Sequence, residues 1–226
     1  MKTRFNLFTL PHKGLRHALQ SLVYQAGRLD SSCQLERDTF LKEWKKIVLM
    51  LHQHATDEDI FIQPLIDKFN PDLAKELENQ HRQSEDLLGK MENAIAEIET
   101  EKTWTHESNL RWLTFLDDLN RFTGDYFLHL YHEECFAMPC LWSYLDDEAL
   151  IVVGNKVRSG VPPHIQQTFQ QYMIPAMNKH ERLMMLSSVK QHAPQEVFEG
   201  VCRTVQELLS PVEWEVLHKE VSDLAC

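Results

Sequence analysis

The apolar residues of this chain recur with the period of an α-helix over four long segments. Leucines and other apolar residues follow one another every three or four positions over about residues 11–29, 37–61, 71–98 and 107–136, which is the pattern of an amphipathic helix. No segment alternates convincingly with the period of a strand, and the 226 residues include only 7 glycines. Four long helices joined by short links predict an all-α fold built on an antiparallel, up-down-up-down four-helix bundle.

The pattern changes after Tyr144, where shorter segments with explicit helix caps follow one another. Asn178 to Glu181 and Ser210 to Glu213 have the spacing of capping boxes, and proline pairs or single prolines separate the segments. Nothing in this part has the composition of a linker. We therefore predict a four-helix bundle over residues 1–145 and a helical extension over residues 146–226 that packs against it, with Phe198 and Trp214 buried.

Charge and composition exclude several classes of protein. The chain has 34 acidic and 23 basic residues, a formal net charge of -11, and no basic run, so we expect neither nucleic-acid nor membrane binding. No apolar run approaches the roughly 20 residues that span a bilayer, and the N-terminal residues do not form a signal peptide. The five cysteines are odd in number and lack CxxC spacing, which favours free thiols and a cytoplasmic location.

An eleven-residue pattern occurs twice in the predicted bundle. Residues 54–64 read HATDEDIFIQP and residues 129–139 read HLYHEECFAMP. Each copy has a histidine, an acid pair four and five positions later, a phenylalanine and a closing proline. Internal repeats of this kind indicate architecture, and this repeat places the same polar groups on the second and fourth predicted helices.

One histidine lies on the apolar stripe of each of the four predicted helices. Glutamates follow two of these histidines after one helical turn, whereas His17, His52 and His132 lie off the stripes or at their edges. The inward-facing polar set is His12, His54, Glu58, His81, His129 and Glu133. A single core histidine is more often structural than a ligand, but this set gathers four imidazoles and two carboxylates in one interior.

Two buried carboxylates without compensation would cost several kcal/mol, and a pair of metal ions supplies the missing positive charge. Mixed imidazole and carboxylate ligands suit iron, manganese or zinc. Two carboxylates shared between two ions would hold the pair together. The four bundle helices contain one Glu-x-x-His sequence, Glu78 to His81, whereas ferritin-like carboxylate proteins use two together with two further glutamates. The imidazole-rich set argues against that class.

These residues and the doubled HxxxE motif resemble the hemerythrin family, and specifically the bacterial hemerythrin-like HHE cation-binding domains, over about residues 8–140. The resemblance implies a non-haem centre of two iron ions, for which manganese or zinc could substitute. It also implies that Glu58 and Glu133 bridge the irons. By the same resemblance, His12 and His54 serve one iron, and His81 and His129 serve the other.

The chain departs from the classical oxygen-carrying members at two positions. Leu77 stands where those proteins have a further histidine, and Glu133 lies four residues after His129 where they have an aspartate five residues after. The resemblance then implies one imidazole fewer and an open metal position near Leu77. Two neighbours have alternative roles: Glu85 could approach the gap or be a solvated acid, and Tyr126 could donate a hydrogen bond or only pack.

The residues and the resemblance together predict a di-iron protein that binds or senses O2, NO or peroxide. The alternatives are a di-iron enzyme, which would act as an oxidase or peroxidase or remove NO, and a protein for iron storage or delivery. No DNA-binding or signalling module follows the bundle, which argues against a dedicated signal transducer. The physiological ligand and the oligomeric state stay open at this point.

Overall fold

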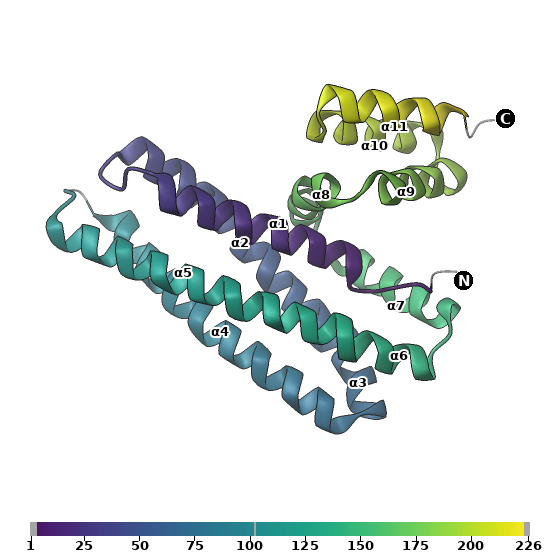
Figure 1. The fold of residues 1–226 in the computed structure, drawn as a ribbon, viewed down its shortest axis with the longest axis horizontal. Helices are drawn as coiled ribbons and strands as arrows, with labels where there is room; N and C mark the ends of the chain where they lie inside the picture. Colours follow the sequence, from purple (N-terminus) through teal and green to yellow (C-terminus); the bar gives the residue numbers. More distant parts are fainter. Residues whose placement is uncertain (1–3, 102, 224–226) are drawn as a thin grey trace.

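The computed structural model describes residues 4–101 and 103–223, and every regular element in these ranges is helical (Figure 1). The described residues contain no strand, so the prediction of an all-α chain is confirmed. No helix among them has the length and apolarity needed to cross a membrane.

Four long helices correspond to the four predicted segments. They are α1 (Thr9–Arg28), α2 (Gln34–Phe61), α4 (Pro71–Thr100) and α5 (His106–His132). They lie alongside one another on the long axis of the molecule (Figure 1). Helix α1 packs against α2 and α5, and α4 packs against α5, while the ion pairs Lys45–Glu99 and His52–Glu92 join α2 to α4. The four helices therefore surround a common interior.

Polar side chains cap the first turns of two of these helices, α4 and α5. The Asn70 side chain accepts a hydrogen bond from the backbone N–H of Leu73, and Pro71 occupies the first helical position, where its missing N–H costs nothing. Thr105 and Ser108 form a capping box at the start of α5. These caps pair backbone N–H groups that the helix itself leaves unpaired.

Both copies of the repeated motif end in a change of helix. Helix α2 stops at Phe61 and the short helix α3 (Gln63–Phe69) follows. Helix α5 passes into a π-helix, η1 (Glu133–Ala137), and then into α6 (Met138–Tyr144). The predicted single helix to Phe136 is thus wrong beyond His132. Because Pro139 lacks an N–H and its ring clashes with the carbonyl one turn earlier, the chain widens, and the Met138 N–H bonds to the Glu133 carbonyl.

The remaining helices lie beyond the bundle in sequence and partly against it in space. They are α7 (Asp147–Gly160), α8 (Pro163–Ala176), α9 (Lys179–His192), α10 (Gln195–Leu208) and α11 (Pro211–Asp223). Helix α8 packs against α1 and α2, and α7 packs against α2. Helices α9 to α11 pack mainly on one another, at the top of the view in Figure 1.

Helix α8 approaches α1 very closely at Gly14. A Cβ at this position would lie 3.1 Å from Met173 Cβ and 3.3 Å from the Met173 backbone, so only glycine fits without a shift of α8. Next to this contact, the His17 Nδ1–H donates to the Tyr172 carbonyl at 2.9 Å, and the Tyr172 hydroxyl donates to Glu43 on α2. Lys13 on α1 also forms an ion pair of 2.7 Å with Glu181 on α9, the helix that follows α8. The docking of α8 is therefore specific.

Two apolar clusters fill the bundle, and the predicted histidines lie between them. The larger cluster includes Leu15, Leu51 and Leu88. The smaller one includes Phe8, Ile62, Leu77, Ala137 and Met138. Each of the four histidines falls in sequence between a residue of one cluster and a residue of the other, so a polar layer separates two hydrophobic cores.

A third cluster lies in α8 to α11, and it corrects one prediction. Its buried members are aliphatic, among them Leu186, Val205 and Leu217, whereas Phe198 and Trp214 are only partly buried at its edge. Short helices enclose a small core that branched side chains fill, and the two large rings cover its rim instead of entering it.

Candidate metal centre

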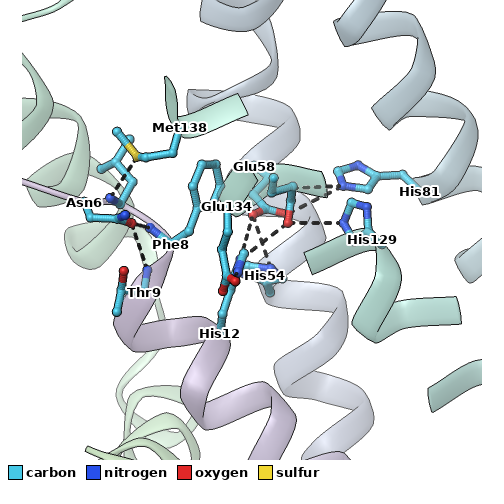
Figure 2. Close-up of polar contacts among 12 residues, drawn as sticks. Asn6, Phe8, Thr9, His12, His54, Glu58, His81, His129, Glu134 and Met138 are labelled. Atoms are coloured by element: carbon cyan, nitrogen blue, oxygen red, sulfur yellow. Dashed lines mark hydrogen bonds and ion pairs between the residues drawn. The ribbon is translucent and has the colours of Figure 1, made fainter. Parts of the chain in front are cut away.

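The structure brings together all six residues of the predicted polar set. Each of the four long helices contributes one histidine, α2 adds Glu58, and η1 adds Glu133 directly after α5. Each of the six side chains belongs to a residue that is at most 7% exposed. In Figure 2, His12 and His54 lie on one side of Glu58, and His81 and His129 lie on the other.

The six residues form two groups that share both carboxylates. Ligand atoms of His12, His54, Glu58 and Glu133 lie within 4.8 Å of one another, and those of Glu58, His81, His129 and Glu133 do the same. Glu58 lies 3.2 Å from His54 Nε2 and 3.6 Å from His81 Nε2. Each group thus has two imidazoles and two carboxylates, and the two groups share an edge.

The polar atoms that face the middle of this layer are buried and lack hydrogen bonds. Among the described residues, they include the Nε2 atoms of His12, His54 and His81, both Glu58 carboxylate oxygens and Glu133 Oε2. Buried polar groups in folded proteins are normally paired. Unpaired nitrogen and oxygen donors that converge from four helices fit a cation, so the residues present suit a metal.

The second acid of each repeat holds a histidine of another helix. The His81 Nδ1–H donates to Asp59 at 3.1 Å, and the His12 Nδ1–H donates to Glu134 at 3.0 Å. Arg16 fixes the Glu134 carboxylate with two further bonds. Such carboxylate–histidine contacts point Nε2 inward and make it a better donor. The acid pairs of the repeat therefore have two roles, because the first acid faces the centre and the second orients an imidazole.

His129 is oriented by an amide that sequence patterns did not single out. Its Nδ1–H donates to Gln80 Oε1 at 3.1 Å, and Gln80 Nε2–H donates to His132 Nδ1 at 2.7 Å. Gln80 directly precedes His81, which is the one signal that could have drawn attention to it. His17 and His52 lie outside the centre, since His17 contacts α8 and His52 pairs with Glu92 at the surface.

Without a metal ion, protons compensate the buried carboxylates. Burial alone would lower the pKa of His12, but Glu134, Glu58 and Glu133 raise it to about 9. Burial acts likewise on His81, and Glu133 and Glu58 raise its pKa to about 11. Burial would raise the pKa of Glu58, but the neighbouring histidines hold it well below its usual value.

The pKa values of the other two histidines, His54 and His129, are lowered instead of raised. Burial lowers the pKa of His54 to about 4, and burial also lowers the pKa of His129. Without metal, the surroundings therefore favour protonation of His12 and His81 and disfavour protonation of His54 and His129. The two added protons are the charges that a cation would replace, so metal binding should release protons.

A comparison with known protein families identifies the family to which this helical metal-binding domain belongs. The family model for the hemerythrin HHE cation-binding domain matches residues 3–142. The chain belongs to the hemerythrin family. The matched range contains all six residues of the centre and ends within α6. Neither the curated proteins nor the solved structures contain a match.

The hemerythrin family assignment gives the polar layer its chemical meaning. The chain carries a metal-binding helical domain, and the two buried His and Glu groups are positioned to hold the metal. Helices α7 to α11 lie beyond the range that the hemerythrin model matches. The close contact of α8 with α1 is therefore not accounted for by the family match.

The pH dependence of the metal-free hemerythrin domain follows from the raised pKa values of His12 and His81. Both pKa values lie above the ordinary value of about 6.5. The stability that the two charged imidazoles contribute is therefore fully present below pH 6.5, and it is lost as the pH rises through about 9 for His12 and about 11 for His81. We expect the free energy of unfolding to fall between pH 7 and pH 9 in chelator. Urea titrations at several pH values measure it.

The matched sample for this experiment is the metal-loaded protein. Metal replaces the two protons, so the alkaline loss of stability should be much smaller after loading. A metal-free protein whose stability is flat or rises from pH 7 to pH 9 would contradict the paired charges described above.

The outer carboxylates should tune metal affinity without being ligands. Asp59→Asn keeps the shape of the side chain but removes the charge that faces His81 Nδ1. Loss of such a partner typically costs about 10–100-fold in metal affinity, and we expect a loss in this range, measured by competition with a chromophoric chelator. Asp67→Asn, on the exposed face of α3, is the control. Equal affinities of the two variants would show that Asp59 does not act on the centre.

Proposed function

We propose that this chain is a non-haem di-iron protein whose centre binds small oxidants or diatomic molecules. In this proposal, α1, α2, α4 and α5 form the antiparallel up-down-up-down bundle. His12 and His54 would hold one iron, and His81 and His129 would hold the other. The observation that carries the proposal is the pair of donor groups with both carboxylates in common.

The shared carboxylates favour two ions over one. Glu58 faces His12, His54 and His81 at 3.2 to 3.8 Å, and Glu133 faces His12 and His129 at 3.4 Å. A single cation would leave one imidazole pair without a partner. With Glu58 and Glu133 as bridges, two cations are each offered two imidazoles and two carboxylate oxygens, and the positive charge of the ions offsets the buried negative charge.

The chemical types of the donor groups also indicate which metals the centre would bind. Imidazole and carboxylate ligands suit iron, manganese and zinc, whereas soft thiolate ligands are absent from both described groups. A di-iron centre, when bound, supplies redox-active cations that interact with O2, NO or peroxide. The protein's own residues would orient the ligands through Asp59, Glu134 and Gln80 and exclude bulk water from the layer.

The experiment adds small molecules to the anaerobically reduced, iron-loaded protein. We expect optical spectra that change stoichiometrically after addition of O2, NO or peroxide, and that depend on Glu58. Glu58→Gln, which removes the charge but keeps the size, should lose the spectroscopic signs of a coupled iron pair.

The same experiment separates binding from turnover. One spectral change per centre, reversed when the small molecule is removed, supports a binding or sensing role. Continued consumption of peroxide or NO would make the protein an enzyme, and release of iron on demand would indicate storage or delivery. A loaded protein whose spectra respond to none of the three molecules would refute the proposal.

A further inference from the structure

A small cavity is lined by both histidines of one donor group and by neither histidine of the other. It lies between α2, α4 and α5 and has a volume of about 20 Å³, enough for one water-sized molecule. Glu58, His81 and His129 line its inner end, and the exposed residues His52 and Glu85 line its outer end. Exposed residues and the donor group formed by His81 and His129 therefore line the same cavity.

The cavity does not reach the histidines of the other donor group, His12 and His54. No described residue of α1 lines the cavity, and His12 is 0% exposed. Phe8 packs against the His12 ring, with ring centroids 5.1 Å apart, and both side chains are labelled in Figure 2. The two halves of the centre have similar donors, but among the described residues only the histidines of one half line this cavity.

The polar lining of the cavity contains one buried side chain outside the predicted ligand set. Tyr126 is 5% exposed, and its ring centroid lies 5.8 Å from that of His129. Ser84 is half-buried, and the other polar residues are either predicted ligands or exposed at the outer end. A tyrosine hydroxyl can donate a hydrogen bond to a small molecule in the cavity.

The surroundings of Leu77 also favour entry of a small molecule through the cavity at Ser84 and Glu85, not beside Leu77. The resemblance implies an open metal position near this residue, but Leu77 is 1% exposed and belongs to the cluster with Phe8, Ile62 and Met138. The cavity lies in the other direction along α4, at Ser84 and Glu85. The apolar cluster therefore covers the side at which classical members have a further histidine.

We propose that small molecules enter between α2 and α4, bind only at the metal held by His81 and His129, and accept a hydrogen bond from Tyr126. This inference rests on the proposed di-iron function. The ligand class is small molecules, such as those of two or three atoms, that can accept a hydrogen bond, since the cavity is small. Tyr126 is a positioning residue for the bound molecule.

The test uses the full chain loaded with iron, and azide as the probe. Ser84→Trp places a large ring in the cavity wall, and we expect azide association to slow by roughly 10-fold or more with iron content unchanged. Ala94→Trp adds the same ring at a half-buried position of α4 that does not line the cavity, and it should bind azide as the wild type does.

Tyr126→Phe tests the hydrogen bond. Loss of one such bond should weaken azide binding by about 3–10-fold and shift the infrared stretching frequency of bound azide, while two irons stay bound. Tyr131→Phe, at an exposed position of the same helix, is the matched control and should change neither quantity. A purely structural role of Tyr126 would leave the stretching frequency unchanged.

Iron analysis of every variant separates the two proposals. If the wild type binds no iron pair, the di-iron function fails and this inference fails with it. If iron is bound but Ser84→Trp and Tyr126→Phe bind azide as the wild type does, the access path is refuted and the di-iron centre stands. Should Ser84→Trp lose iron, Ala55→Leu narrows the cavity from α2, and unchanged azide association in that variant overturns the path.

Discussion

Alanine at His12, His54, His81 or His129 is expected to lower iron loading more than any other single change in the bundle. Each substitution would remove a buried donor from a group of four. The loss of affinity should exceed the roughly 10–100-fold that follows loss of an outer hydrogen-bonding partner. Iron per chain after gel filtration, measured by elemental analysis, checks this.

The controls are histidines on the same helices. His52→Ala removes an exposed imidazole of α2 that pairs with Glu92, and it should keep full iron loading. His17→Ala removes a contact of α1 with the Tyr172 carbonyl, so it should lower stability slightly but not iron content. Full loading in His54→Ala together with loss of iron in His52→Ala would mean that the assignment of α2 faces is wrong.

Removal of residues 146–226 should destabilise the bundle although all six residues of the centre remain. Helix α8 covers α1 and α2, and Tyr172 is 4% exposed in the intact chain. Burial of one large side chain stabilises by about 1.5–3 kcal/mol, and several such groups would be lost from a total that is typically about 5–15 kcal/mol. We expect a large fall in melting temperature, or aggregation, in the truncated chain.

A single substitution tests the same contact without truncation. Gly14→Ala places a methyl group against Met173 at 3.1 Å, and we expect a loss of about 1–3 kcal/mol from overpacking. Gly89→Ala, which meets nothing within 4 Å in α4, should instead gain about 0.5–1 kcal/mol from helix propensity. If Gly14→Ala and the truncated chain both melt as the intact protein does, the extension is independent of the bundle.

The burial of the predicted ligand residues could be inferred from the sequence because helix periodicity fixes the faces of helices as well as their positions. A histidine three or four residues from Leu15, Leu51 or Tyr126 must lie on the buried side of the same helix. The structure places His12, His54 and His129 there, together with His81 of α4. The repeat added the equivalence of Glu58 and Glu133, which the two donor groups reflect.

Other features depend on contacts between helices that periodicity does not encode. Asp59 and Glu134 each bond to a histidine of a different helix, and Gln80 reaches across to His129. The π-helix at Glu133 results from the position of Pro139 relative to the end of α5. The cavity at Ser84 depends on how α2, α4 and α5 are spaced, which no single helix determines.

Anaerobic titration of the metal-free protein with ferrous iron, followed by elemental analysis and Mössbauer spectroscopy, tests the central claim most directly. The shared carboxylates predict saturation at two irons per chain and, after oxidation, spectra of an exchange-coupled pair that Glu58→Gln disrupts. Saturation at one iron, no stoichiometric binding, or two uncoupled ions would contradict a centre in which Glu58 and Glu133 serve both donor groups.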